Sequence, residues 1–548
     1  AGSTGIIGRY QIDLSPDGVI WGDAVSSGTF ADDATVKTVT FAASPARYVR
    51  LTALTETGGS GRWTGGAEIN LLGGTVAAAG PNLGAWSGTI GFPLVPVAAA
   101  MLSTGRLLTW SSYDPYNFGG GGKTYTATLN LTNGTVSQRT VTETGHDMFC
   151  PGTAVLPDGR VLVNGGADSA KTSIYNPATD TWTTGPTMNI PRGYNADTTL
   201  PDGRVFTLGG SWSGGQGGKD GEAWSPTAGW QALPGVPVAP MLTADPQGVY
   251  RADNHGWFFA TSGGRVFQAG PSKAMNWYDT AGSGGTTPAG LRGDDQDAMN
   301  GNAVMYDVGK ILTVGGAPAY QNANATANAY VVDINSGVTV RRVASMSYAR
   351  AFHNSVVLPD GKVLVVGGEA YPVPFSDDTS VLYPELWDPA TETFTTMAAM
   401  TVPRNYHSVA MLLPDGRVFS GGGGLCGSCS TNHPDGQIFT PPYLLNPDGT
   451  AVSRPSITKA PNTATAGSTI TVATKRAVTR FALVRMGSAT HSIDNDQRRI
   501  PLTPTSSSGT RYALSIPADR GVVLPGYYML FALNSAGVPS VSRIIRIS

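Results

Sequence analysis

PDGKVLVVGG, at residues 359–368, is one copy of a plan that recurs along the chain. A glycine followed by a basic residue makes a tight turn, an apolar strand follows, and glycines end most of the strands. The plan occurs in STGRLLTWSS (103–112), PDGRVLVNGG (157–166), PDGRVFTLGG (201–210), SGGRVFQAGP (262–271), DVGKILTVGG (307–316), PDGKVLVVGG itself and PDGRVFSGGG (414–423). Successive turn glycines lie 44 to 61 residues apart. Seven copies at this period predict seven small sheets of similar design.

Three of the copies are followed by a second shared segment with an aromatic residue, a proline and threonines. These segments are SIYNPATDTWTTGP (173–186), AWSPTAGWQALP (223–234) and LWDPATETFTTM (386–397). The combined unit resembles the kelch repeat, in which each repeat is one four-stranded blade of a propeller. We therefore expect an all-β protein with a seven-bladed kelch β-propeller over residues 76–452. A β-sandwich with recurrent turns is the alternative.

The two flanks of the repeats have a different pattern. Residues 1–75 contain alternating strands around turns, as in RYQIDLSPDGVIWG and ARYVRLTALTE, and look like the later part of a discoidin-like, carbohydrate-binding β-sandwich. Residues 453–548 read as an antiparallel sandwich of immunoglobulin-like type. The abrupt start, without a signal peptide, leads us to expect further sequence upstream.

Composition narrows the class of protein. The 548 residues include 72 Gly and 38 Pro, yet 41% are hydrophobic, which favours many short strands over disorder. Only 14% are charged and the formal net charge is −2, so a nucleic-acid partner is not expected. No apolar run approaches the roughly 18 residues of a membrane span. We expect a secreted monomer that acts on a small molecule.

Equivalent positions in successive blades of a propeller form a ring around its axis. The residues nine positions before the turn glycines are Pro96, Cys150, Tyr194, His255, Asn300, Phe352 and His407. Cys, Tyr and His account for 3, 20 and 6 of the 548 residues, so four of them in seven ring positions is an unusual concentration. The alternative is that they are ordinary buried blade residues. The ring predicts that Cys150, Tyr194 and His407 meet at one central site.

These residue types favour copper. Imidazole nitrogens and a phenolate oxygen suit Cu(II), whereas Ca²⁺ and Mg²⁺ require carboxylates, which the ring lacks. Zinc remains the second possibility, although it gives no purpose to a tyrosine beside a cysteine.

Four longer segments carry a closer resemblance. HDMFCPG (146–152), PRGYNADTTLPDGRVFTLGGSWSGG (191–215), NYHSVAMLLPDGRVFSGGGGLCGSC (405–429) and GSATHSIDNDQRRIPL (487–502) resemble the active-site segments of the galactose oxidase family of copper-radical oxidases. The resemblance extends from about residue 5 to the end and implies the same three-domain layout.

The resemblance implies a role for each matching residue. Cys150 would be joined through a thioether to the ring of Tyr194, which then persists as a radical. One copper ion would be bound by Tyr194, Tyr406, His407 and His491, with Tyr406 axial and acting as general base. Trp212 would stack over the cross-link and shield the radical. His491 lies in the C-terminal domain, outside the repeats.

The resemblance also implies a substrate pocket. Arg251, Tyr320 and Gln321 would contact a galactose-type substrate, with Phe118 and Phe375 as an apolar wall and Trp212 beside them. His255 is expected to lie behind the copper ligands without binding the metal. The acidic segment LRGDDQDAMNGN (291–302) is expected near the pocket mouth, where it could alter substrate preference.

The remaining cysteines, Cys426 and Cys429, are close enough in sequence to pair, and a disulfide would fit an oxidising compartment. A redox motif or half of a zinc site, with His433 nearby, are the alternatives. The N-terminal module lacks the cysteines and early cation ligands usual in the family, although Glu68 is present, so its carbohydrate binding is in doubt.

The implied reaction converts a primary alcohol and O2 to an aldehyde and H2O2, with galactose or galactosides as the expected substrates. The first rival is the same chemistry on aliphatic or aryl alcohols or on glyoxal-type aldehydes. The second rival is a non-enzymatic kelch propeller that binds glycan or protein.

Overall fold

The computed structural model describes residues 6–15, 21, 24–33, 35–39, 41, 46, 48–57 and 81–548. Its contacts divide the chain into two compact units, residues 1–80 and 81–548. The expected boundary at residue 75 and Glu68 lie outside the described residues. The boundary expected at residue 452 stays a prediction.

The N-terminal unit contains two small antiparallel sheets among its described residues. One has the order β3-β2-β4, formed by β2 (Arg9–Ser15), β3 (Ser26–Thr29) and β4 (Tyr48–Ala53). The other pairs β1 (Ile6–Ile7) with β5 (Glu56–Thr57). Tyr10 stacks on Phe30, with ring centroids 4.1 Å apart.

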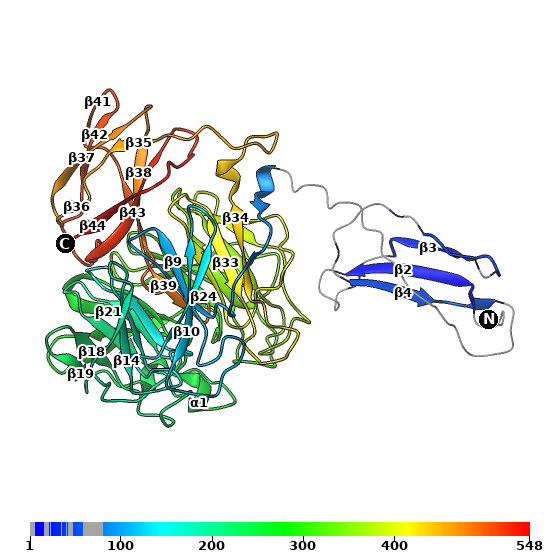
Figure 1. Cartoon of the computed structure of the whole chain (residues 1–548), viewed down its shortest axis with the longest axis horizontal. Coiled ribbons are helices and arrows are strands. Elements are labelled where there is room, and N and C mark those ends of the chain that lie inside the picture. The colour runs from blue at the N-terminus through cyan, green and yellow to red at the C-terminus, as the bar shows by residue number, and fades with distance from the viewer. Residues whose placement is uncertain are drawn as a thin grey trace. The chain divides into compact units, whose positions relative to one another are not determined.

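The second unit begins with seven antiparallel sheets, which confirms the fold class expected from the repeats (Figure 1). From the axis outward, the first four sheets consist of β8 (Ala98–Met101), β9 (Arg106–Trp110), β10 (Thr124–Asn130) and β11 (Val136–Val141); β12 (Gly152–Val155), β13 (Val161–Asn164), β14 (Thr172–Asn176) and β15 (Thr181–Thr184); β16 (Ala196–Thr199), β17 (Val205–Leu208), β18 (Glu222–Ser225) and β19 (Gly229–Ala232); and β20 (Trp257–Ala260), β21 (Arg265–Gly270), β22 (Ala274–Asp279) and β23 (Gly285–Leu291).

The other three sheets continue the ring. They consist of β24 (Asn302–Asp307), β25 (Lys310–Val314), β26 (Ala329–Asp333) and β27 (Thr339–Arg342); β28 (Ala351–Val357), β29 (Val363–Glu369), β30 (Glu385–Asp388) and β31 (Thr393–Thr396); and β32 (Ser408–Leu412), β33 (Val418–Gly422), β34 (Asp435–Thr440) and β6 (Ala85–Trp86), with β7 (Ile90–Gly91) also paired to β34. The last sheet therefore takes its outermost strand from the segment that precedes the first sheet. From β12 to β32 the innermost strands pack on one another in chain order, and β32 packs on β8.

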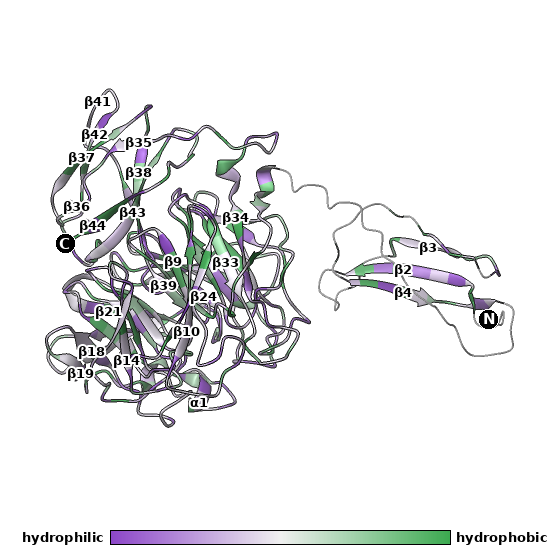
Figure 2. Ribbon diagram, viewed as in Figure 1, coloured by the Kyte–Doolittle hydropathy of each residue, from purple (hydrophilic) through white to green (hydrophobic). Residues whose placement is uncertain are grey.

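Burial follows position in each sheet. The inner strands β28 and β33 are buried throughout, whereas at least half of the residues in the outermost strands β15 and β31 are exposed. Figure 2 shows the apolar character of β33. The turn glycine between the first two strands of every sheet has a positive φ, from 64° at Gly309 to 99° at Gly361, a conformation that favours glycine.

The C-terminal residues form two further sheets around their own apolar core, which includes Phe481 and Tyr512. The sheets have the orders β35-β37-β42-β41 and β36-β44-β43-β38-β40, formed by β35 (Ile457–Lys459), β36 (Thr463–Ala464), β37 (Thr469–Thr474), β38 (Arg480–Arg485), β40 (Arg499–Leu502), β41 (Ser506–Ser508), β42 (Arg511–Ser515), β43 (Gly526–Leu533) and β44 (Arg543–Ile547). One strand, β39 (Ser488–Thr490), leaves this domain and pairs with β8 of the propeller (Figure 1).

Helices in the described part of the chain are short: η1 (Pro81–Leu83), η2 (Ala239–Met241), α1 (Val249–Ala252), η3 (Ser262–Gly264) and η4 (Pro442–Leu444). None of the helices in the described ranges is long and apolar enough to cross a membrane.

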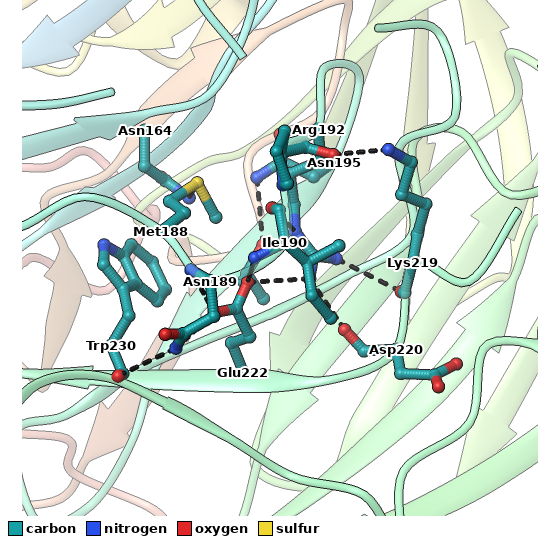
Figure 3. Close-up of polar contacts among 12 residues, drawn as sticks. Asn164, Met188, Asn189, Ile190, Arg192, Asn195, Lys219, Asp220, Glu222 and Trp230 are labelled. Atoms are coloured by element: carbon teal, nitrogen blue, oxygen red, sulfur yellow. Dashed lines mark hydrogen bonds and ion pairs between the residues drawn. The ribbon is translucent and has the colours of Figure 1, made fainter. Parts of the chain in front are cut away.

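A buried arginine ties neighbouring blades together at three places. Arg192 forms an ion pair with Glu222 at 2.9 Å, and both side chains are inaccessible to solvent (Figure 3). Arg192 Nη1 also donates to the carbonyl of Gly209 at 3.0 Å, while its own carbonyl accepts from the N–H of Gly166 in the preceding blade at 2.9 Å. We call this arrangement the arginine clamp.

The same clamp recurs in two other blades. Arg350 pairs with Glu385 at 2.6 Å and donates to the carbonyl of Gly367 at 3.0 Å. Arg404 pairs with Asp435 and donates to the carbonyl of Gly422 at 3.1 Å. The carbonyls of Arg350 and Arg404 both accept at 2.8 Å from the preceding blade, through Gly316 and Gly368.

Arg192→Met should lower the free energy of unfolding by about 3–5 kcal/mol, because it leaves the Glu222 carboxylate buried without its partner. Urea denaturation followed by circular dichroism measures the effect. The control is Arg341→Met, which breaks the largely exposed Arg341–Glu392 pair and should cost at most about 1 kcal/mol. Equal losses in the two variants would show that the clamp contributes no more than a surface pair.

Candidate metal centre

The ring residues share an unusual backbone conformation. Six of the seven have a positive φ, between 55° at His255 and 70° at His407, and Pro96 does not. This left-handed conformation is unfavourable for residues other than glycine and persists only where the surroundings impose it. The N–H of Tyr194 donates to the carbonyl of Cys150 at 2.9 Å, and the N–H of His255 to that of Tyr194 at 3.0 Å. These bonds connect successive blades around the axis.

Three potential metal ligands converge at the axis. Cys150 Sγ lies 3.1 Å from His491 Nε2 and 4.0 Å from His407 Nε2, and one ligand atom of each residue lies within 4.8 Å of the others. The hydroxyls of Tyr194 and Tyr406 hydrogen-bond to each other beside them. The structure thus brings together the cysteine, both tyrosines and both histidines singled out from the sequence.

His491 reaches this site because its segment is held inside the propeller. Thr490 of β39 pairs with Ala98 of β8. Further along, Asp496 accepts the N–H groups of Val155 and Thr199, both at 3.0 Å, from two innermost strands. Asn495 and Gln497 accept from two more, Phe258 N–H and Val357 N–H, both at 3.1 Å. This polar segment anchors the C-terminal domain in the axis.

Both imidazoles are oriented for metal binding. The carbonyl of Gly424 lies 2.6 Å from His407 Nδ1; a carbonyl only accepts, so Nδ1 carries the proton and Nε2 presents a lone pair. Thr490 Oγ1 contacts His491 Nδ1 at 2.9 Å. Burial lowers the pKa of His407 to about 3 and that of His491 well below its ordinary value, so both rings are neutral, as ligands must be.

The phenols of Tyr194 and Tyr406 have raised pKa values, in contrast to the lowered values of the two histidines. Burial raises the pKa of Tyr406 to about 12 and that of Tyr194 well above its ordinary value. A phenolate at this position therefore requires a nearby positive charge, which a bound metal cation provides. Two neutral imidazoles and two phenols fit Cu(II), and the described residues contribute no carboxylate to this group.

Trp212 covers Tyr194. The two rings are stacked 4.7 Å apart with an angle of 4° between their planes. Trp212 is only partly exposed and lies on the segment between β17 and β18. It therefore separates one face of the Tyr194 ring from solvent.

A cavity of about 350 Å³ opens above these rings. Its walls are Phe118, Phe149, Tyr194, Trp212, Tyr250, Arg251, Gln321, Asn322, Val373, Pro374, Phe375, Tyr406 and His407. Phe118 and Phe375 stack with centroids 5.6 Å apart and form a flat apolar wall. The expected substrate residues thus surround one cavity, with one exception.

That exception is Tyr320, which is fully buried and is not among the residues that line the cavity. The guanidinium carbon of Arg251 lies 3.9 Å from the centroid of the Tyr320 ring. Asp245 accepts the N–H of Tyr320 at 2.6 Å, and Gln247 accepts from Arg251 Nε at 3.1 Å. Arg251 Nη1 is buried and has no hydrogen-bond partner among the described residues, so it remains available as a donor.

His255 lies behind the metal site, as expected, and the other three histidines have their own surroundings elsewhere. His255 Nε2 contacts the Tyr320 hydroxyl at 3.3 Å, and its ring stacks 4.7 Å from that of His491, behind the site. His146 is satisfied by Ser173 Oγ and the Gly165 carbonyl, both at 2.9 Å, and His433 pairs with Asp377 at 3.0 Å. His353 is buried in β28.

Cys426 and Cys429 form a disulfide with Cα atoms 5.6 Å apart, so the redox-motif and half-zinc alternatives are not adopted. The segment around this disulfide contacts one wall residue of the cavity, Phe375, and a neighbour of another, Tyr116. Thr431 Oγ1 donates to the Phe375 carbonyl at 3.3 Å, and the N–H of Gly427 donates to the Tyr116 carbonyl at 2.8 Å.

The acidic segment 291–302 does not line the cavity, contrary to expectation. Asp295 pairs with buried Arg292 at 2.9 Å, and Asp297 accepts the N–H groups of Ala244 and Lys273 at 2.7 and 2.8 Å. These carboxylates are engaged in holding loops together, which local composition alone does not reveal.

Sequence reasoning missed several cavity residues and supports. Phe149, Tyr250, Asn322, Val373 and Pro374 each lie within three residues of a predicted site residue, and that proximity was the available signal. Gly424 had no such signal, because it acts through its backbone carbonyl.

Comparisons with known proteins agree with this geometry. Residues 301–429 match the family model described as the glyoxal oxidase N-terminus, and residues 454–547 match the galactose oxidase-like early set domain. A galactose oxidase of Gibberella zeae is 50% identical over 560 residues, covering 99% of this chain and 82% of that protein. The aldehyde oxidase GLOX of Vitis pseudoreticulata is 27% identical over 437 residues, 73% of this chain and 82% of the relative.

One solved structure is also similar to this chain. It is described as a novel fungal alcohol oxidase with catalytic diversity among the AA5 family, in complex with copper. The two structures align with a TM-score of 0.82 and 44% sequence identity, covering 85% of this chain and all of that one.

His491→Ala should reduce the Cu(II) affinity of the metal-free protein by at least about a hundredfold, because even loss of a residue that only supports a ligand costs 10–100-fold. Isothermal titration with Cu(II) measures this. His433→Ala, which removes a partly buried histidine paired with Asp377, serves as the control and should bind normally. Unchanged affinity in His491→Ala would show that the C-terminal domain supplies no ligand.

Proposed function

The chain belongs to the galactose oxidase family, and from that premise we propose that it oxidises primary alcohols with O2 at a copper ion held by Tyr194, Tyr406, His407 and His491. The products are the aldehyde and H2O2. The observation that carries the proposal is the meeting of two neutral imidazoles and two buried phenols, three of which line one cavity.

The oxidation removes two electrons and two protons from the alcohol. Tyr406, held as a phenolate by the bound cation, would take the hydroxyl proton. A hydrogen atom from the carbon passes to the Tyr194 oxygen, which requires Tyr194 to begin as a radical. Copper, when bound, supplies the acceptor for the second electron and the place where O2 is reduced. O2 gains both electrons and both protons, leaves as H2O2, and returns Tyr194 to the radical.

We assign the stability of that radical to a thioether between Cys150 and the ring of Tyr194. Both residues belong to one buried apolar cluster at the cavity floor, and their backbones are hydrogen-bonded. A sulfur substituent donates electron density to the ring and lowers the potential at which it loses an electron. Trp212, stacked on the same ring, limits access of solvent and reductants.

Galactose or a galactoside is the substrate that the cavity favours. Arg251 offers an unpaired N–H donor and Gln321 an amide, both suited to sugar hydroxyls. The stacked Phe118 and Phe375 suit the C–H face of a sugar ring. We further propose that the chain is a secreted monomer; the disulfide supports an oxidising compartment.

A second candidate is an aliphatic or aryl alcohol, or a glyoxal-type aldehyde. The flat apolar wall of Phe118 and Phe375 would hold an aromatic ring as well as a sugar. A substrate panel with H2O2 detection separates the two candidates, because each predicts turnover of a different class of substrate.

Tyr194→Phe should abolish both oxidase turnover and the thioether while the protein stays folded, since the reacting oxygen is lost. Intact mass after copper loading checks the cross-link, whose formation removes two hydrogens, about 2 Da. The wild type should show this loss and Tyr194→Phe should not. Substantial H2O2 production by the variant would overturn the radical assignment.

Arg251→Ala should raise KM for galactose about tenfold to hundredfold, as expected for losing a hydrogen bond from a charged donor. Small alcohols have no remote hydroxyls and should keep their KM. Steady-state kinetics on both substrates measures the contrast. An equal rise for both would mean that Arg251 maintains the shape of the cavity, and no change for either would favour the second candidate.

A further inference from the structure

The segment that carries Trp212 has little side-chain material to hold it in place. Between β17 and β18, residues 209–221 read GGSWSGGQGGKDG, and seven of these thirteen residues are glycine. Six of those glycines have a positive φ, and residues 214–216 are exposed. Glycine-rich backbone loses more conformational freedom on ordering than any other. The flat stacking of Trp212 on Tyr194 therefore requires an explicit restraint.

The ends of the Trp212 stretch are fixed by hydroxyl groups. Ser211 donates to both carboxylate oxygens of Asp253, from its N–H at 2.9 Å and from Oγ at 2.6 Å. Ser213 Oγ donates to the carbonyl of Gly166 at 2.7 Å. These bonds hold the residues on either side of Trp212, and Ser211 Oγ also accepts the N–H of Gly217 at 2.9 Å, but the carbonyls of Ser213 and Gly214 need another donor.

Lys219 supplies the missing restraint. It is only 1% exposed, and its ammonium donates to the carbonyls of Ser213 at 3.0 Å, Gly214 at 2.8 Å and Pro191. The first two carbonyls follow Trp212 directly, whereas Pro191 lies three residues before Tyr194. Figure 3 shows the Lys219 side chain extended toward the segment of Arg192, with its backbone carbonyl bound by that arginine at 3.1 Å.

We propose that Lys219 is a positioning residue of the oxidase: its ammonium fastens the Trp212 segment to the Tyr194 segment and keeps the two rings stacked. The inference rests on the proposed function, because the stacking matters for catalysis only if Tyr194 carries a radical. Three carbonyls match the three N–H donors of an ammonium, so a charge can be buried here without an acidic partner in direct contact.

The charge state of Lys219 supports this assignment. Burial lowers the pKa of Lys219 to about 8; the neighbouring Arg192 guanidinium adds to the effect, and the Asp253 carboxylate opposes it. Arg192 is itself paired with Glu222. Below this pKa the side chain has three donors for three carbonyls. Above it, the neutral amine has two donors and turns a lone pair toward a carbonyl, so the restraint weakens as pH rises.

The first test uses metal-free protein and needs no activity. Lys219→Met keeps the length of the side chain and removes its donors. Hydrogen exchange by mass spectrometry should show about tenfold faster exchange in residues 209–221, where the Ser211 and Gly217 amides are hydrogen-bonded, and no change in β17. The control, Lys362→Met, removes a lysine paired with Asp388 in another blade and should leave 209–221 unchanged.

The second test follows the radical in oxidised, copper-loaded enzyme. Its optical absorption should decay several-fold faster in Lys219→Met than in the wild type or Lys362→Met. In a Trp212→Phe background, the same lysine substitution should add little, because Lys219 acts through Trp212. An additive effect, or unchanged decay despite faster exchange, would overturn the positioning role.

If Lys219→Met does not fold, hydrogen exchange of the wild-type protein at several pH values provides the test. Exchange of 209–221, corrected for the intrinsic pH dependence, should accelerate between about pH 7 and about pH 9, whereas β17 should not change. Constant protection across this range would refute the proposal. If no wild-type radical forms, the proposed function fails, while the exchange data still decide whether Lys219 restrains the Trp212 segment.

Discussion

The inner surface of the propeller depends on the arginine clamps. Each clamp joins two blades through one residue, because the arginine carbonyl binds a glycine N–H of the preceding blade and its guanidinium binds a glycine carbonyl and an acid of its own blade. Arg192 lies two residues before Tyr194, and Arg404 three residues before His407. The clamps thus hold the chain immediately before Tyr194 and His407, two of the six ring residues with a left-handed φ.

Without a metal, the histidines and tyrosines of this site are all uncharged. Its histidines are neutral and its tyrosines resist ionisation, both as a result of burial. One divalent cation reverses the balance for the phenols without penalising the imidazoles. The same burial that keeps water from the Tyr194 ring therefore also keeps both imidazoles neutral and able to bind a metal.

The sequence predicted most where a repeat or a motif carried the information. The turn glycines fixed one register for seven blades, and that register alone placed Cys150, Tyr194 and His407 together. His491 could be found only by resemblance, because no period links the C-terminal domain to the axis. The acidic segment near Asp295 was misjudged, because its partners, Arg292 and two backbone amides, are set by the packing of loops. Gly424 acts through its own backbone carbonyl, and the Lys219 ammonium binds the backbone carbonyls of other residues. Contacts with backbone atoms cannot be predicted from residue types.

The last sheet of the ring can form only after most of the chain has been synthesised. The outermost strand of the last sheet, β6 (Ala85–Trp86), is synthesised before any blade, but its partner β34 (Asp435–Thr440) is synthesised after the other six. β39 and His491 emerge later still. After Cys150 and Tyr194 have been synthesised, about 300 more residues must follow before His491, the last of the residues proposed to hold copper, is present. The residues proposed to hold copper therefore come together only after the C-terminal domain has been made and β39 has paired with β8.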